Sequence, residues 1–172
     1  MGALYGVLIG FLVSAPTLFV GHLGATPQIF GLTFGTIALT VASSQIVNAW
    51  ALERWRSAVV ARAAIRALVV SMAAAALFFG ALGPTFGGVV LALVALAATF
   101  SVALTNHVAL AMRPWAAEAG AASGMIGFAM IGMGALLGAS IGAFAATGVA
   151  TIFLGFTLAA ALAALADARR PA

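Results

Sequence analysis

The sequence predicts an all-α, multi-pass membrane protein with six transmembrane helices in a single domain over residues 1–172. Of the 172 residues, 65% are hydrophobic and only 6% are charged, whereas a soluble domain carries about 25% charge. Six apolar runs approach the length of about 20 residues that a bilayer crossing needs. The charged residues stand at the ends of these runs, and no polar linker or low-complexity segment divides the chain.

Composition also excludes several functions. Cysteine is absent, which removes disulfides, cysteine-bound metals and thiol nucleophiles. The net charge of +4 comes from arginine, and its place beside apolar runs indicates membrane headgroups rather than nucleic acid. Ser123 in AASG has no histidine on any later span to take its proton, so we expect a packing residue and not a protease nucleophile. We expect no enzyme activity, no metal and no cofactor.

The first predicted span covers residues 3–20 and contains a proline in its second half. Pro16 removes a backbone hydrogen bond and should bend or break the helix, which is tolerated where neighbours or water satisfy the freed carbonyl. Phe11, Ser14 and Thr17 are therefore candidates to face a cavity at that bend. The alternative is that both hydroxyls bond back to their own helix.

The second predicted span covers residues 28–52. Thr26 and Pro27 read as the N-cap and first helical position. Gly31 and Gly35 form a pair of small residues four apart, which favours close helix packing in membranes. A polar group near the far end of the span is expected to border a water-filled vestibule; it consists of Ser43, Ser44, Gln45 and Asn48.

The third and fourth predicted spans cover residues 67–82 and 89–112. The third helix is expected to begin earlier, with Arg62 and Arg66 reaching out to the membrane surface. The fourth ends in Thr105, Asn106 and His107. Asn106 is a candidate for an inward polar contact, because a buried amide is costly unless it is paired. His107 is the one titratable candidate within a span, and it is either a functional group or an interfacial histidine that faces the headgroups or the vestibule.

The fifth predicted span covers residues 119–143, after Glu118, whose charge suits a helix N-terminus. It carries glycine at nearly every turn, and its four-residue repeats comprise Gly120, Gly124, Gly134, Gly138 and Gly142. Such spacing drives close helix packing, here expected on more than one side; the alternative is a biased composition. The sixth span covers residues 151–166 and is closed by Asp167, Arg169 and Arg170.

The arginines predict the orientation of the chain. They lie between the second and third spans, between the fourth and fifth, and in the tail, while the other three connections carry no charge. By the positive-inside rule the arginine-bearing side is cytoplasmic. We therefore predict a protein of the plasma (inner) membrane with both termini in the cytoplasm. All three tryptophans fall on the same side, as expected for a membrane interface.

Two stretches resemble one transporter family. The first contains SAP, PQIFGLTFG and SSQIVN, followed by an arginine-bearing turn; the second is TNHVALAM followed by RPWAAEAGAASGMIGF. In this order they resemble the carboxy-terminal half of Bcr/CflA-type drug exporters of the major facilitator superfamily. Asn106 matches the asparagine of the tenth helix of that family, while Thr105 and His107 replace its usual proline and small residue. Ala119, Gly120, Ala122 and Ser123 match the start of its eleventh helix.

The resemblance implies a fold and a partner. The six spans would be helices seven to twelve, arranged as two inverted three-helix repeats, with the first and fourth lining the substrate cavity. The second and fifth would face an amino-terminal six-helix half, which is expected to supply the acidic residues for proton coupling. Hydrophobic or amphipathic small molecules would contact the cavity candidates Phe11, Ser14, Pro16, Thr17, Phe100, Thr105 and Asn106.

Three hypotheses follow. In the first, the chain is half of a proton-coupled multidrug antiporter, either a fragment or a subunit, and does not transport alone. In the second, it is a membrane scaffold that transports nothing. In the third, two copies form a homodimeric small transporter. In all three hypotheses the protein lies in, and contacts, the lipid bilayer.

Overall fold

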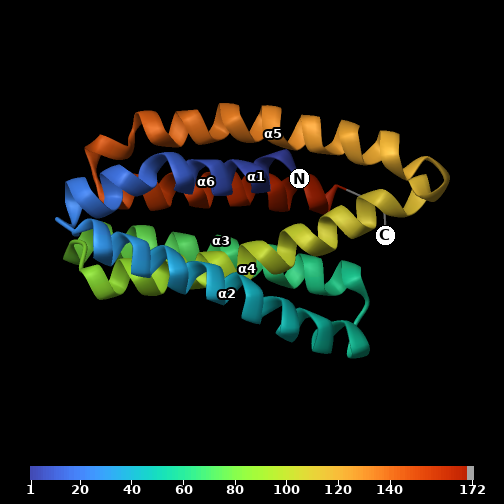
Figure 1. The fold of residues 1–172 in the computed structure, drawn as a ribbon, viewed down its shortest axis with the longest axis horizontal. Helices are drawn as coiled ribbons and strands as arrows, with labels where there is room; N and C mark the ends of the chain where they lie inside the picture. Colours follow the sequence, from blue (N-terminus) through green and yellow to red (C-terminus); the bar gives the residue numbers. More distant parts are fainter. Residues whose placement is uncertain (170–172) are drawn as a thin grey trace.

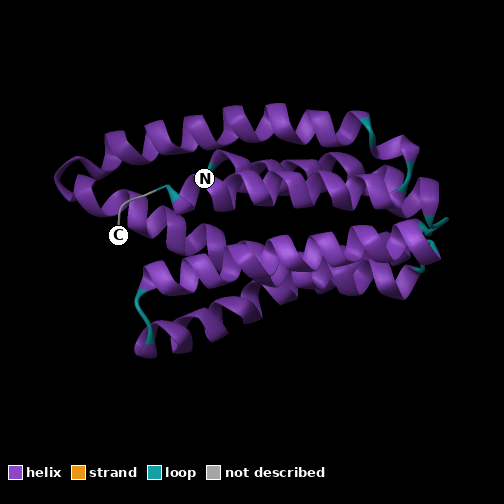
Figure 2. Ribbon diagram, turned by 180° about the vertical axis from the view of Figure 1, so that it is seen from behind, coloured by secondary structure: helices purple, strands orange, loops and turns teal. Residues whose placement is uncertain are grey.

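The computed structural model describes residues 1–169, which are helical apart from short turns and contain no β-strand (Figure 1, Figure 2). Arg170 lies outside the described residues. The helices are α1 (Gly2–Pro16), α2 (Pro27–Arg54), α3 (Ser57–Leu82), α4 (Phe86–Met112), α5 (Ala119–Ala143) and α6 (Val149–Ala168), with shorter elements η1 (Thr17–His22), η2 (Arg113–Glu118) and η3 (Ala145–Thr147).

Local sequence signals set several of the helix ends. Thr26 is the N-cap of α2, where its hydroxyl accepts a hydrogen bond from the amide of Ile29 at 3.4 Å, and Pro27 follows it, so this prediction is confirmed. Thr85 caps α4 in the same way, 3.2 Å from the amide of Gly88. Gly83 ends α3 at a φ of 81°, in the region that glycine adopts at least cost. α3 begins at Ser57, before the predicted span that starts at residue 67, so the expected earlier start of this helix is confirmed.

Pro16 changes the helix type instead of breaking the chain's helical course. The α-helix continues directly into η1, a π-helix. A proline has no backbone N–H to give to the preceding turn, and π-helical turns occur mostly as short insertions in α-helices. At the end of η1, Nε2 of His22 lies 2.8 Å from the carbonyl oxygen of Ala145 and so joins this segment to η3.

Within residues 1–169, five segments are long and apolar enough to cross a membrane: Gly2–His22, Pro27–Arg54, Ser57–Leu82, Phe86–Thr147 and Val149–Ala168. The fourth is 62 residues long, far more than one crossing needs. It contains α4, η2 and α5, and its helical geometry is interrupted at Trp115. In Figure 1 the chain turns back at this point, so that α4 and α5 run in opposite directions.

The helices form two layers, with α1, α5 and α6 in one and α2, α3 and α4 in the other (Figure 1). The most extensive contacts join α1 to α5, α1 to α6, α3 to α6, α3 to α4, and α2 to α4. Thus α1 is central in its layer, and the contact between α3 and α6 joins the two layers. The apolar core lies where these helices meet; its largest fully buried side chains include Phe19, Leu68, Leu93, Phe153 and Phe156.

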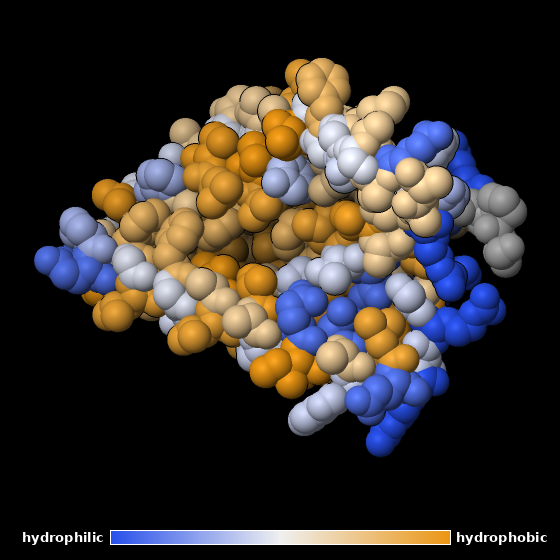
Figure 3. Space-filling view, turned by 45° about the vertical axis from the view of Figure 1, so that its right-hand side comes forward, coloured by the Kyte–Doolittle hydropathy of each residue, from blue (hydrophilic) through white to orange (hydrophobic). Residues whose placement is uncertain are grey.

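The burial pattern of α2 is the reverse of that of a helix in a soluble protein. Its buried residues are all polar, namely Thr33, Ser44 and Asn48, while Leu32 and Leu39 are more than 70% exposed. α5 likewise exposes large apolar side chains, including Phe128. In Figure 3 apolar residues cover the body of the molecule, and hydrophilic ones gather mainly at one end. Such a surface fits lipid or another apolar helix, not water.

Glycines bring α1 and α5 into close parallel contact. Gly134, Gly138 and Gly142 lie against Tyr5, Ile9 and Val13 of α1. In return, Gly2, Gly6 and Gly10 of α1 lie against Met133, Leu137 and Ile141 of α5. Each helix therefore presents small residues to the large side chains of the other. The predicted packing role of Gly134, Gly138 and Gly142 is therefore confirmed, and the helix that they contact is α1 of the same chain.

Candidate functional site

Buried polar side chains form a line between α2 and α4, which we term the polar seam: Ser44, Asn48, Ser101 and Asn106. The hydroxyl oxygens of Ser44 and Ser101 lie 2.6 Å apart. The amide nitrogen of Asn106 donates to Oδ1 of Asn48 at 2.7 Å. These contacts hold α2 onto α4 in an otherwise apolar region, where an unpaired polar group would be costly.

Asn106 is the centre of this arrangement. Besides Asn48, its amide nitrogen donates to the carbonyl oxygen of Val102 at 2.9 Å. Its Oδ1 accepts a hydrogen bond from the hydroxyl of Ser57 at 2.8 Å, at the start of α3. One side chain, 2% exposed, therefore joins α2, α3 and α4 near the arginine-bearing end.

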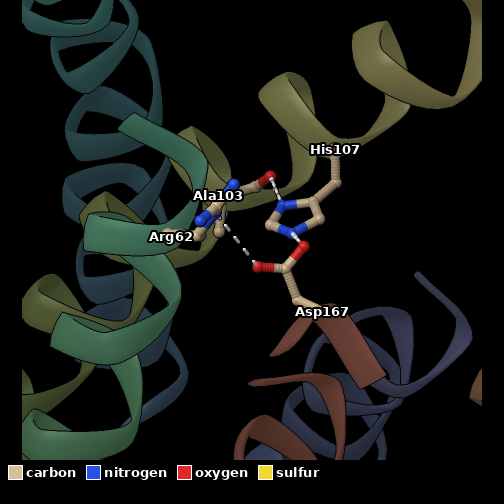
Figure 4. A network of polar contacts seen from close by, with 4 residues as sticks. All are labelled: Arg62, Ala103, His107 and Asp167. Carbon is tan, nitrogen blue, oxygen red and sulfur yellow. Dashed lines mark hydrogen bonds and ion pairs between the residues drawn. The ribbon is translucent and has the colours of Figure 1, made fainter. Parts of the chain in front are cut away.

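A second polar cluster lies near the same end of α4 and contains His107, Asp167 and Arg62 (Figure 4). Nδ1 of His107 is 2.7 Å from the carbonyl oxygen of Ala103, on its own helix. Nε2 points at Asp167 of α6 and lies 3.3 Å from Oδ1. The other carboxylate oxygen is 4.0 Å from Nε of Arg62, on α3. His107 is thus a buried group between helices, not one facing headgroups.

The cavity candidates do not share one environment. Phe11, Ser14, Phe100 and Asn106 are buried, Thr17 is half-buried, and Pro16 and Thr105 are exposed. The hydroxyl of Ser14 donates to the carbonyl oxygen of Gly10 at 2.7 Å, on its own helix. Phe11 stacks on Phe34 of α2, with ring centroids 5.3 Å apart.

A shallow groove of about 510 Å³ runs beside the polar seam, between α2, α3 and α4. The groove is lined mostly by small apolar side chains, together with the hydroxyl groups of Thr40, Ser43, Ser44 and Thr99. Sequence reasoning singled out the serines but not Thr40 or Thr99. The signal was present, because threonine or serine recurs at three- and four-residue spacing along α2.

The remaining predicted packing glycines have no neighbour within the described chain. A Cβ added at Gly31, Gly35, Gly120 or Gly124 would meet no atom within 4 Å. These positions lie on the uncovered parts of α2 and α5, so their role in packing stays a prediction.

Sequence reasoning missed the partners of the two polar clusters. Ser57, Ser101 and Asp167 come from different helices, and their contacts span long separations along the chain. Comparisons add no assignment: no family model, no curated protein and no solved structure matches this chain.

Proposed function

We propose that this chain is a six-helix half of a secondary transporter with the major facilitator architecture, exporting hydrophobic or amphipathic small molecules together with a second six-helix half. In this proposal α1 to α6 each cross the membrane, the 62-residue segment Phe86–Thr147 crosses twice, and the arginine-bearing end is cytoplasmic. The substrate class rests on the sequence resemblance to Bcr/CflA-type exporters.

The observation that carries the proposal is a symmetry in the helix contacts. Exchanging α1, α2 and α3 for α4, α5 and α6 turns the contact of α1 with α5 into that of α4 with α2. The same exchange turns the contact of α3 with α4 into that of α6 with α1 and leaves that of α3 with α6 unchanged. Equivalent helices run in opposite directions in Figure 1. This is the pattern expected of two inverted three-helix repeats.

The uncovered surfaces of α2 and α5 support the part of the proposal that requires a second six-helix bundle. The two helices are equivalent under the exchange, and both carry glycine pairs open to approach, at Gly31 and Gly35 and at Gly120 and Gly124. Small residues at this spacing admit a second helix at close range. A second bundle would therefore find two related docking helices.

Because the chain has no cysteine, single introduced cysteines report the topology directly. We expect cysteines at Thr26, Thr85 and Thr147 to react with a membrane-impermeant maleimide in intact cells. Cysteines at Ser57 and Ala116 should react only after the membrane is opened. Labelling of Ala116 and Thr85 from the same side would exclude two crossings by Phe86–Thr147.

Transport is tested by efflux of ethidium from a bacterial strain that lacks its main drug exporters. The chain is expressed alone and together with the amino-terminal half of a Bcr/CflA-type exporter. We expect ethidium accumulation to fall only when both halves are present. Efflux by the chain alone would favour the homodimer, and a stable complex with no efflux would favour a scaffold.

A further inference from the structure

The hydrogen bond within α4 fixes which nitrogen of His107 carries hydrogen. Nδ1 lies 2.7 Å from the carbonyl oxygen of Ala103. A carbonyl oxygen can only accept, so Nδ1 must be the donor. In the neutral ring the other nitrogen then has a lone pair and no hydrogen. Nε2 is therefore an acceptor unless the ring takes up a second proton.

This bare nitrogen faces another acceptor. Nε2 lies 3.3 Å from Oδ1 of Asp167, is buried, and makes no hydrogen bond within residues 1–169. An ionised carboxylate beside a neutral Nε2 would place two lone pairs together in a site with little access to water, which is costly. One added proton turns the repulsion into a charge-assisted contact.

We infer that His107 and Asp167 form a buried proton-binding site, in which the proton resides on Nε2 and the carboxylate is its counter-ion. Asp167 is 15% exposed and His107 is 4% exposed, so protons enter from water past the carboxylate. This site does not depend on the proposed transport function.

The surrounding charges favour that placement of the proton. From α3, Nε of Arg62 lies 4.0 Å from Oδ2 of Asp167, which favours the ionised carboxylate. The other charged side chains described at this end are exposed: Glu53 and Arg54 of α2, Arg56 before α3, Arg66 of α3, Arg113 and Glu118 of η2, and Arg169 after α6. No residue of α1 (Gly2–Pro16) has a charged side chain. Arg62 is thus a cation placed to stabilise the ionised form of Asp167.

The protonated His107 to Asp167 contact connects α4 and α6, both of which also pack against α3. Extensive contacts link α3 to α4 and α3 to α6, and the His107 to Asp167 contact joins α4 to α6 directly. Loss of the proton as pH rises would restore the two facing acceptors and weaken this connection. The arginine-bearing ends of α4 and α6 would then separate.

The first test is the ¹⁵N spectrum of the histidine ring in lipid nanodiscs. The chain has two histidines, so His22→Gln leaves only the signals of His107. At neutral pH we expect both ring nitrogens to carry hydrogen, with Nδ1 remaining protonated when Nε2 is not. A neutral ring with hydrogen on Nε2 alone, or a bare Nε2 at neutral pH, would overturn the inference.

The second test measures the separation of α4 and α6. Spin labels are placed on cysteines at Ala109 and Leu165, both exposed, and their distance is measured at about pH 6 and about pH 9, across the range in which histidine changes charge. The distance should increase and its distribution broaden at the higher pH. In Asp167→Asn the amide can donate to bare Nε2, so the distance should stay short at both values. An identical response in both proteins would contradict a proton-dependent connection.

Discussion

Replacing Gly138 by leucine is expected to separate α1 from α5 and to prevent the protein from accumulating as a folded species. Even a single added Cβ would lie 2.5 Å from Cγ2 of Ile9 and 2.9 Å from the backbone nitrogen of Gly10. The second contact is with backbone, which a rotamer change cannot relieve. Overpacking by one carbon typically costs about 1–3 kcal/mol, so Gly138→Ala should already lower the melting temperature in detergent measurably.

A matched control lies earlier in the same helix. A Cβ added at Gly124 would meet no atom within 4 Å, so Gly124→Ala should leave the melting temperature of the isolated chain unchanged or slightly raised. The double variant Ile9→Ala with Gly138→Ala should recover only part of the loss, because the contact with Gly10 persists. Equal stability of the two single alanine variants would show that α1 and α5 are not in the close contact described.

The sequence predicts those features of the fold that depend on residues close together in the chain. Hydropathy and length predict the long apolar helices, and Thr26 with Pro27 predicts the start of α2, because these signals lie within a few residues. The glycine repeat of α5 predicts a close-packed face for the same reason. Its partner in α1 was missed, although Gly2, Gly6 and Gly10 show the same spacing. The run was read there only as a span, since a repeat by itself does not identify the helix it meets.

The polar clusters show that the sequence does not predict which distant residues pair with one another. The cost of burying an amide predicts that Asn106 needs partners, and it has three. Nothing local selects Asn48 or Ser57 from the other polar residues of the chain. Asp167 is likewise predicted only as the end of the sixth span, because arginines follow it in the sequence. Only the packing of α6 against α3 brings it to His107.

Asn106→Leu should therefore be the second most damaging single substitution. It fills a similar space, yet it removes three hydrogen bonds and leaves the buried amide of Asn48 without its donor. Interhelical hydrogen bonds in membranes contribute about 0.6 kcal/mol on average, but an unsatisfied buried polar group costs about 1–3 kcal/mol. We expect a loss of about 2 kcal/mol in stability. Thr105→Ala, at the exposed neighbouring position, is the control and should have little effect.

A double-mutant cycle separates the cost of the lost hydrogen bonds from the cost of the unpaired amide of Asn48. If the unpaired amide dominates, Asn48→Leu combined with Asn106→Leu should be less damaging than the sum of the single variants, because the double variant leaves no stranded amide between α2 and α4. Ser57 would still lack its acceptor, so the recovery should be incomplete. Strict additivity of the two substitutions, measured by denaturation in the same detergent, would mean that the two amides do not interact and that this pair does not help to hold α2 onto α4.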